Sequence, residues 1–367
     1  MTRTEAYLAL NLLPKVGPVR LRKLLQVFGS PELILRAKAQ AIRAVEGFGE
    51  DLTSAIVGWE SQVDLSRELR RISEEGLTIL TQEDDLYPAL LKQIYDPPIV
   101  LYVRGELTPR DRHAIAIVGS RRATNYGLTV SKKLGFQLAY AGYTVVSGLA
   151  RGVDTAAHEG ALASTGRTIA VIGSGHGKLY PPENQALAER IAQQGAVVSQ
   201  FPVDYPPDRQ SFPLRNRIVS GWSCAVVVTE APLRSGSLIT AGQALEQGRT
   251  VYAVPGNIDR ATSQGCNRLI QEGAKLVMDG ADIIDDLLTL FPTQPVAPEL
   301  PGLSVPKIPL TSEESAVYQA LGDKEAHIND LVSESGLALP QLNVTLMKLE
   351  MKRLVKALPG KYYTKLV

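Results

Sequence analysis

Short apolar runs alternate with helical segments from residue 114 to about residue 290, and this alternation limits the folds that the chain can adopt. The runs, such as residues 115–118 and 224–229, contain almost no polar residues, which is typical of strands buried on both faces of a parallel sheet. Between them, segments such as residues 129–142 repeat apolar residues at helical spacing. The pattern predicts a doubly wound, Rossmann-like α/β sheet with right-handed crossovers.

The first of these strands ends in a turn of small and basic residues: Gly119, Ser120, Arg121 and Arg122. We expect Ser120 to cap the helix that follows. Unpaired backbone N–H groups and the helix dipole attract anions to such a turn, and the two guanidiniums add full positive charge. A dinucleotide fingerprint is excluded, because Gly119 and Gly127 lie too far apart and no acidic residue follows the next strand where a ribose 2′-OH would need it. The turn predicts a phosphate-binding loop for a ligand other than NAD.

Glycine, serine and a cation also follow nearly all of the remaining strands of the predicted sheet. Ligands of such sheets bind at the carboxyl ends of the strands, so these loops would form one positively charged edge with many backbone donors. An edge of this kind follows the phosphates of a nucleic acid strand, and Tyr180 is a candidate surface for base stacking. A packing role for Tyr180 and structural ion pairs for Arg215 and Arg217 are equally consistent with the sequence. The candidate contacts beyond the first turn are Arg151, Lys178, Tyr180, Arg215, Asn216, Arg217, Ser235, Gly236 and Ser237.

The segment before the sheet, residues 1–75, contains two phrases in which glycine or proline forms a tight turn and opens an amphipathic helix. This is the pattern of a repeated helix–hairpin–helix or of a small helical module of the sterile-alpha-motif type. Both DNA contact through backbone N–H groups and a packing role remain open. We assign the sheet domain to residues 76–290 and expect the extended segments 77–80 and 96–105 to add to an edge of the sheet.

Two further segments follow the sheet. Residues 291–310 are rich in proline and almost free of charge, which predicts a semi-rigid linker. Residues 311–367 predict three helices and a β-hairpin, the arrangement of a winged helix. Winged helices serve both as DNA-binding and as partner-docking modules, and the sequence does not separate the two.

Catalytic chemistry is hard to assemble from this sequence. Residues 173–178 resemble a Walker A loop, but the loop is one residue short and Leu179 stands where a Mg²⁺-binding hydroxyl is required. Asp154 and His158 lie one helical turn apart without a third partner, so we expect Asp154 to cap a helix and His158 to pack. We therefore expect no catalytic residue, no metal site and no cofactor.

The composition limits the partners and the cellular compartment that fit this chain. The formal net charge of +1 means that any positive potential must be a local patch. No run approaches the about 20 apolar residues of a membrane span, and the N-terminus lacks an apolar signal core. The 2 cysteines show no metal or redox spacing and indicate a reducing compartment. These observations predict a cytoplasmic protein with no membrane contact.

The ordered motifs of the chain resemble the DNA-processing protein A (DprA, also called Smf) family. The segments that carry the resemblance are residues 117–122, 147–158, 212–218, 230–240, 254–257 and 265–274. The resemblance implies an extended Rossmann fold that binds single-stranded DNA and forms a homodimer through that domain. It also implies a partner, the RecA recombinase, which the family loads onto incoming single strands during natural transformation. By position, Gly119, Ser120 and Arg121 match the family's phosphate pocket, and Lys178 falls in the loop where a second DNA-binding lysine is expected.

A second hypothesis belongs to a different class. The same Rossmann variant resembles small nucleotide hydrolases, the lysine-decarboxylase-like phosphoribohydrolases, which carry a Pro-Gly-Gly-x-Gly-Thr loop followed by a catalytic glutamate. Here residues 234–240 occupy the comparable position without that loop, although Glu246 follows on the predicted helix. The sequence therefore favours DNA binding over hydrolysis.

Overall fold

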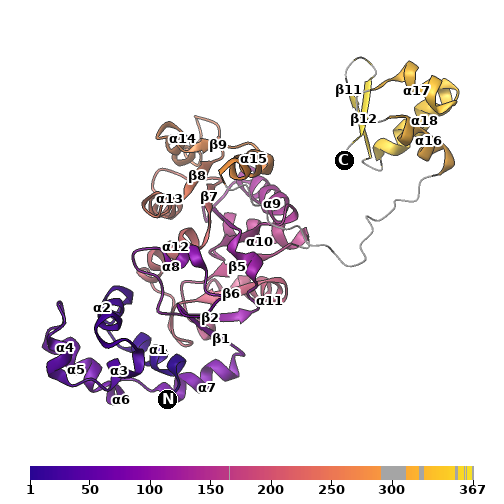
Figure 1. Ribbon diagram of the computed structural model, residues 1–367. Coiled ribbons are helices and arrows are strands. Elements are labelled where there is room, and N and C mark those ends of the chain that lie inside the picture. Colours follow the sequence, from indigo (N-terminus) through magenta and orange to yellow (C-terminus); the bar gives the residue numbers. More distant parts are fainter. Residues whose placement is uncertain are drawn as a thin grey trace. The chain divides into compact units, whose positions relative to one another are not determined.

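The computed structural model describes residues 1–164, 166–290, 311–321, 326–351, 354–358, 360 and 362–365. The chain forms two compact units, Met1–Pro298 and Glu299–Val367, which are described separately below (Figure 1). The predicted linker, residues 291–310, lies outside the described residues. None of the helices that are described combines the length and hydropathy needed to cross a membrane.

A single sheet organises the described part of the first unit, with the strand order β1-β2-β6-β5-β4-β3-β7-β8-β9. Strands β3 to β9 pair in parallel, whereas β1 and β2 pair antiparallel at the edge next to β6. The expectation that two extended segments join a sheet edge is confirmed. The strands are β1 (Thr78–Thr81), β2 (Val100–Gly105), β3 (Ala114–Val118), β4 (Thr144–Ser147), β5 (Thr168–Val171), β6 (Ala196–Ser199), β7 (Ala225–Val228), β8 (Thr250–Ala253) and β9 (Lys275–Leu276).

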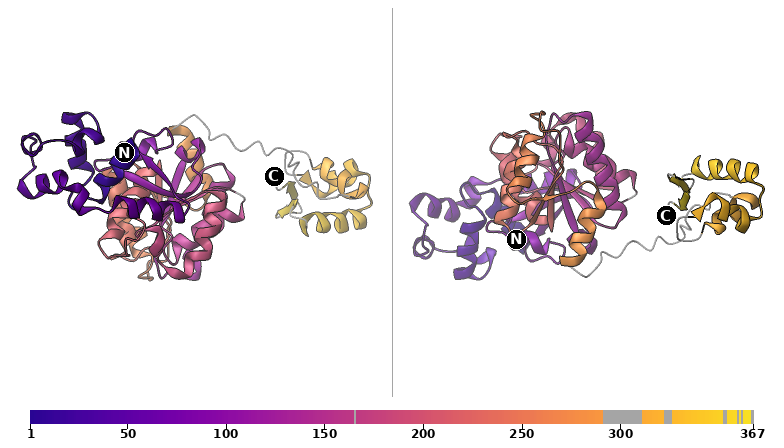
Figure 2. Two further views of the ribbon diagram at one scale, coloured as in Figure 1. Left: turned by 90° about the horizontal axis from the view of Figure 1, so that it is seen from below. Right: turned by 90° about the horizontal axis from the view of Figure 1, so that it is seen from above.

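Helices cover both faces of this sheet, which confirms the doubly wound fold (Figure 2). Successive residues of β3 point to opposite faces: Ile115 and Ile117 belong to one hydrophobic cluster, and Ala116 and Val118 to the other. The first face packs against α9 (Asn125–Tyr140), α10 (Val153–Ala163), α11 (Gln185–Gln194) and α15 (Gly280–Leu290). The second packs against α8 (Ala89–Lys92), α12 (Ser211–Trp222), α13 (Gly236–Glu246) and α14 (Gln264–Gln271). Three single turns of 3₁₀ helix complete the connections: η1 (Pro109–Arg112), η2 (His176–Lys178) and η3 (Pro182–Asn184).

The winding direction of the sheet reverses at β3. From β3 the chain steps outward through β4, β5 and β6, and then returns to place β7 on the other side of β3. The loops that leave β3 and β7 therefore diverge at the carboxyl edge of the sheet. Such a switch point opens a crevice, and open α/β sheets bind their ligands there.

The N-terminal helices share their hydrophobic core with the sheet. Their cluster includes Leu24, Ile34 and Ile56 and continues onto Val100 and Tyr102 of β2. Both glycine-containing turns open helices as predicted, since α2 and α5 begin directly after Gly17 and Gly49. The helices are α1 (Arg3–Leu12), α2 (Pro18–Phe28), α3 (Pro31–Leu35), α4 (Ala39–Arg43), α5 (Glu50–Val57), α6 (Trp59–Gln62) and α7 (Leu65–Glu74).

The second unit has the predicted helices and hairpin, together with a short additional strand. Its core contains Val317, Leu331, Leu342, Leu346 and Val355. The strands pair in the order β10-β12-β11, and all pairs are antiparallel. The elements are α16 (Ser312–Ala320), β10 (Ala326–His327), α17 (Ile328–Ser335), α18 (Leu339–Met351), β11 (Val355–Leu358) and β12 (Tyr362–Lys365).

Candidate nucleic-acid interface

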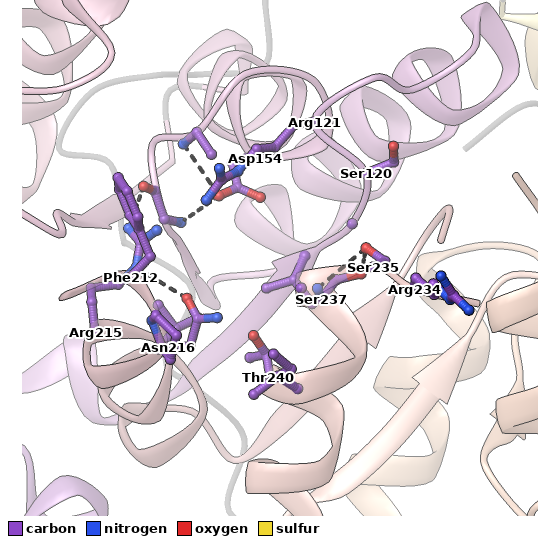
Figure 3. A pocket seen from close by; sticks show the side chains of 18 of the residues that line it. Ser120, Arg121, Asp154, Phe212, Arg215, Asn216, Arg234, Ser235, Ser237 and Thr240 are labelled. Atoms are coloured by element: carbon purple, nitrogen blue, oxygen red, sulfur yellow. Dashed lines mark hydrogen bonds between the residues drawn. The ribbon is translucent and has the colours of Figure 1, made fainter. Parts of the chain in front are cut away.

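A cavity of about 670 Å³ opens at the switch point (Figure 3). Its walls come from the loops after β3, β4, β7 and β8 and from helices α12 and α13. Five arginines but a single acidic residue, Asp154, line it, so the cavity favours anions. The arginines are Arg121, Arg122, Arg209, Arg215 and Arg234.

Hydrogen bonds to Glu230 fix the loop after β3. The backbone N–H of Ser120 donates to the Glu230 carbonyl at 2.7 Å, and the buried Glu230 carboxylate accepts bonds from the Thr124 N–H at 3.0 Å and the Thr124 hydroxyl at 2.5 Å. Gly119 is required here, because a Cβ would lie 2.8 Å from the Glu230 carbonyl oxygen and 2.6 Å from Val153 Cγ2. Sequence reasoning missed Glu230, since an acidic residue beside a phosphate loop gives no signal until its partners are known.

The expectation that Ser120 caps the following helix is wrong. Helix α9 begins at Asn125, and its cap is Thr124, whose hydroxyl accepts the Gly127 N–H at 3.3 Å. The Ser120 hydroxyl instead accepts the N–H of Arg122 at 3.1 Å, inside the loop. This bond curls the loop, while the side chains of Arg121 and Arg122 remain exposed.

Aromatic rings stand beside the cationic loop. The Arg121 guanidinium lies 4.9 Å above the centre of the Phe212 ring, at a distance typical of a cation–π contact. Tyr180 lies 6.0 Å from Phe212, centroid to centroid, and is 38% exposed. Both rings line a smaller cavity of about 230 Å³ next to the first, together with Arg121, Arg122 and Arg151. Flat rings beside guanidiniums offer stacking surfaces for unpaired bases.

Residues 215–217 lie within helix α12, not in a loop as the sequence suggested. Because successive helical residues are about 100° apart, Arg215 and Arg217 point to opposite sides. Arg215 and Asn216 face the switch-point cavity. The Arg217 side chain is buried elsewhere, where it bonds to the Asp96 backbone and, at 2.5 Å, to the Gln200 side-chain oxygen. The structure thus separates Arg217 from the other candidate contacts.

The remaining candidates lie on three elements. Ser235 caps α13, and its hydroxyl lies 2.7 Å from that of Ser237, so Ser235, Gly236 and Ser237 form the positive end of a helix that faces the cavity. Arg151 is exposed and paired with Glu183. Lys178 is an exposed residue at the end of η2 and lines neither of the two cavities.

Asp154 is buried in the cavity wall, and burial raises the pKa of its carboxyl group, which accepts two backbone N–H groups. The buried histidine and cysteine side chains of the sheet domain are not suited to acid–base or nucleophilic chemistry at neutral pH. His158 packs with Nδ1 2.7 Å from the Thr168 hydroxyl, and burial lowers its pKa to about 3. Burial raises the pKa of the Cys224 thiol to about 11 and that of Cys266 to about 12. In the described parts of the chain, no group of three or more His, Cys, Asp or Glu side chains is placed to hold a metal ion.

Comparison with known proteins identifies the family of the chain. The family model described as DNA recombination-mediator protein A matches residues 78–288, and the model of the DprA winged helix domain matches residues 301–361. The chain belongs to the DprA/Smf family. The resemblance inferred from the sequence is therefore confirmed, and so is the combination of a Rossmann-like sheet with a C-terminal winged helix.

Individual DprA/Smf relatives extend this match. Protein Smf of Synechocystis is 35% identical over 98% of both chains. The DNA processing protein DprA of Bacillus subtilis is 42% identical over 61% of this chain and 75% of its own length. The crystal structure of DprA from Streptococcus pneumoniae superposes with a TM-score of 0.69 at 36% identity, covering 78% of this chain and 98% of that one.

A further solved relative concerns the ligand. DprA from Helicobacter pylori has a TM-score of 0.53 at 32% identity and covers 59% of this chain and 98% of that one. That structure is described as giving insight into the single-stranded DNA binding mode of the H. pylori protein.

Proposed function

We propose that this chain binds single-stranded DNA along the carboxyl edge of its sheet, with the backbone phosphates in the switch-point cavity. The observation that carries the proposal is the composition of that cavity: five arginines, four of which are exposed, one acidic residue, and the N-terminus of α13. Guanidiniums and helix N-termini are the groups that proteins use to bind phosphate. The H. pylori relative, which binds single-stranded DNA, supports this reading.

The aromatic rings favour a single strand over a duplex. In a duplex the bases are stacked on one another, and their faces are not available to protein side chains. Tyr180 and Phe212 stand beside Arg121 at the surface, where an unpaired base can stack at about 1–3 kcal/mol per base. A mixed surface of cations and rings therefore selects unpaired strands.

The position of Glu246, the glutamate that the phosphoribohydrolase hypothesis requires, favours binding without hydrolysis. Glu246 lies near the end of α13 and lines a separate cavity with Arg217 and Asp96. It does not line the phosphate cavity, in which Asp154 is the acidic residue. The chain would thus act as a binding protein and not as a phosphoribohydrolase.

We further propose the cellular role that the DprA/Smf family implies. In the cytoplasm the chain would form a homodimer through its Rossmann-like domain, protect incoming single strands and load RecA onto them during natural transformation. This role is supported by family membership. RecA-dependent ATP hydrolysis should rise when the chain is added to single strands that are coated with a single-strand-binding protein. No stimulation, under conditions in which the chain binds the DNA, would contradict RecA loading.

The binding claim is tested by measuring affinity for single- and double-stranded oligonucleotides of equal length across a salt series. We expect preference for the single strand and a linear fall of log K with log salt. Arg121→Ala should lower the slope by about 0.7, the value for one phosphate contact on a single strand. Arg43→Ala, which removes an exposed arginine of the N-terminal helices, is the matched control and should leave the slope unchanged. Equal binding of both DNA forms, unaffected by Arg121→Ala, would contradict the proposal.

A further inference from the structure

Arg215 lies on the wall of the phosphate cavity, yet its side chain is almost completely buried. It is 3% exposed, and one terminal nitrogen donates to the carbonyl oxygens of both Gly148 and Val171. Its Nε donates to the side-chain oxygen of Asn216 at 3.2 Å. Two of the three guanidinium nitrogens are thus already bonded to protein oxygens. A residue that binds DNA phosphate usually presents such donors to solvent.

The opposite side of the same peptide segment is bonded to Asp154. One Asp154 carboxylate oxygen accepts the N–H groups of Gly148 at 3.1 Å and Ala150 at 3.2 Å. The N–H of Gly148 is therefore bonded to a buried carboxylate, and its carbonyl to a buried guanidinium. A side chain does not fit at this position, because a Cβ on Gly148 would lie 2.6 Å from the Arg215 guanidinium.

The segment held in this way, residues 148–152, forms one wall of the cavity and touches the phosphate loop. The N–H of Val153 donates to the Ser120 carbonyl at 3.2 Å, and a Cβ on Gly152 would lie 2.4 Å from the same oxygen. Leu149 is fully buried with φ of 55°, a conformation that non-glycine residues adopt only when the surroundings impose it. Displacement of this segment would therefore displace the Ser120–Arg121 turn.

We propose that Arg215 and Asp154 are positioning residues. Asp154 binds the N–H of Gly148 and Arg215 binds its carbonyl, and together they hold the 148–152 segment and the neighbouring phosphate loop in their binding geometry. Arg215 does not itself bind the DNA backbone. The inference rests on the proposed function, because the geometry that is held is that of the single-stranded DNA site. The buried charges also offset each other, so the exposed guanidiniums supply the attraction for phosphate.

Substitution of Asp154 separates positioning from simple electrostatics by the sign of its effect. Asp154→Ala removes the one negative charge from the wall of an anion-binding cavity together with the oxygen that accepts the Gly148 and Ala150 N–H groups. If the wall acted only through its charge, this variant would bind single-stranded DNA more tightly. Positioning predicts weaker binding, by about tenfold, because a site that must be ordered on binding loses affinity. Tighter or unchanged binding overturns the proposal.

Variants of Arg215 test the proposal in a second way. Arg215→Gln should weaken binding at every salt concentration but keep the wild-type salt slope, whereas Arg121→Ala lowers the slope by about 0.7. Arg215→Lys, which keeps a donor for the carbonyls, should recover part of the affinity. A slope for Arg215→Gln that falls as far as that of Arg121→Ala would make Arg215 a phosphate contact and overturn the proposal.

Hydrogen exchange tests this positioning without DNA. In Asp154→Ala and Arg215→Gln, the amides of Gly148 and Ala150 should exchange at least tenfold faster than in the wild type, while those of the helices stay protected. Unchanged exchange of these amides overturns the proposal. If the wild type binds no DNA, the proposed function fails, and the exchange result still decides whether Asp154 and Arg215 hold the segment.

Discussion

Glu230 offers the most direct test of how the phosphate loop is held. Its carboxylate accepts two donors from Thr124 and lies at the N-terminus of α9. Glu230→Gln keeps the shape but turns one acceptor oxygen into a donor, so one charged hydrogen bond is lost, at about 1.5–3 kcal/mol. The charge at the helix N-terminus contributes a further about 0.3–1 kcal/mol, and the smaller desolvation cost of the amide offsets part of the sum. We expect a net loss of about 2 kcal/mol in the free energy of unfolding.

This loss is measured by urea unfolding of the whole chain, followed by circular dichroism, with calorimetry as a second probe. The melting temperature should fall by about 3 °C, because a unit of this size has an unfolding entropy of about 0.6 kcal/mol/K. Glu50→Gln is the matched control, since its ion pair with Arg43 is 80% exposed on the glutamate side and should change stability by at most about 1 kcal/mol.

A double-mutant cycle with Thr124→Ala tests the assigned contact. The single Thr124→Ala change removes the cap of α9, at about 1 kcal/mol, as well as the hydroxyl that donates to Glu230. Because both changes remove the same bond, the double variant should be less destabilised than the sum, with a coupling of about 0.5–3 kcal/mol. Additive effects, or a Glu230→Gln variant as stable as the wild type, would refute the account of the loop.

Three further outcomes are expected. Phe212→Leu removes the ring face beneath the Arg121 guanidinium and with it the cation–π and stacking contacts. The affinity for single-stranded DNA, measured by fluorescence anisotropy, should therefore fall about tenfold. An unchanged affinity would exclude the ring from the site. Burial lowers the pKa of His158 to about 3 and that of His176 to about 4, so the unfolded chain takes up protons first as the pH falls below about 6.5. Stability should therefore be full above neutral pH and fall by about 2 kcal/mol per histidine between pH 8 and pH 5, and urea midpoints that do not move over this range would contradict the burial of neutral rings. Gly148→Ala should destabilise the chain by about 1–3 kcal/mol through overpacking against the guanidinium beside it, and wild-type stability would show that the segment can move aside.

The sheet and the edge that is proposed to bind DNA were predictable from the sequence because both depend on local patterns. Uninterrupted apolar runs marked β3 and β7, and the residues that directly follow a parallel strand must lie at its carboxyl edge. Gly119, Arg121 and Ser235 were therefore brought together as expected. The N-terminal turns were also recognisable, since glycine and proline act locally.

The roles of individual buried side chains were not predictable in this way. Arg215 and Arg217 are two residues apart and identical in chemistry, yet helix geometry sends one to the cavity and the other to Asp96. Glu230 accepts from Thr124, which lies 106 residues earlier in the chain. The expectation that Asp154 caps its helix is wrong, because the cap of α10 is Gly152 and the Asp154 carboxylate accepts instead from Gly148 and Ala150 in the preceding loop. Such contacts arise from the three-dimensional packing of loops, which a single sequence does not encode in any local pattern.

The central claim, that a single strand runs across the switch-point cavity, is tested most directly by locating the bound DNA. Single-stranded oligonucleotides carrying 5-iodouracil would be cross-linked to the wild-type chain by light, and the cross-linked peptides identified by mass spectrometry. Bases that stack beside the cationic loop should react with Tyr180 or Phe212, the two rings that line the smaller cavity. Cross-links confined to residues 1–75 or 311–367 would contradict the account and place the DNA on the N-terminal helices or the winged helix.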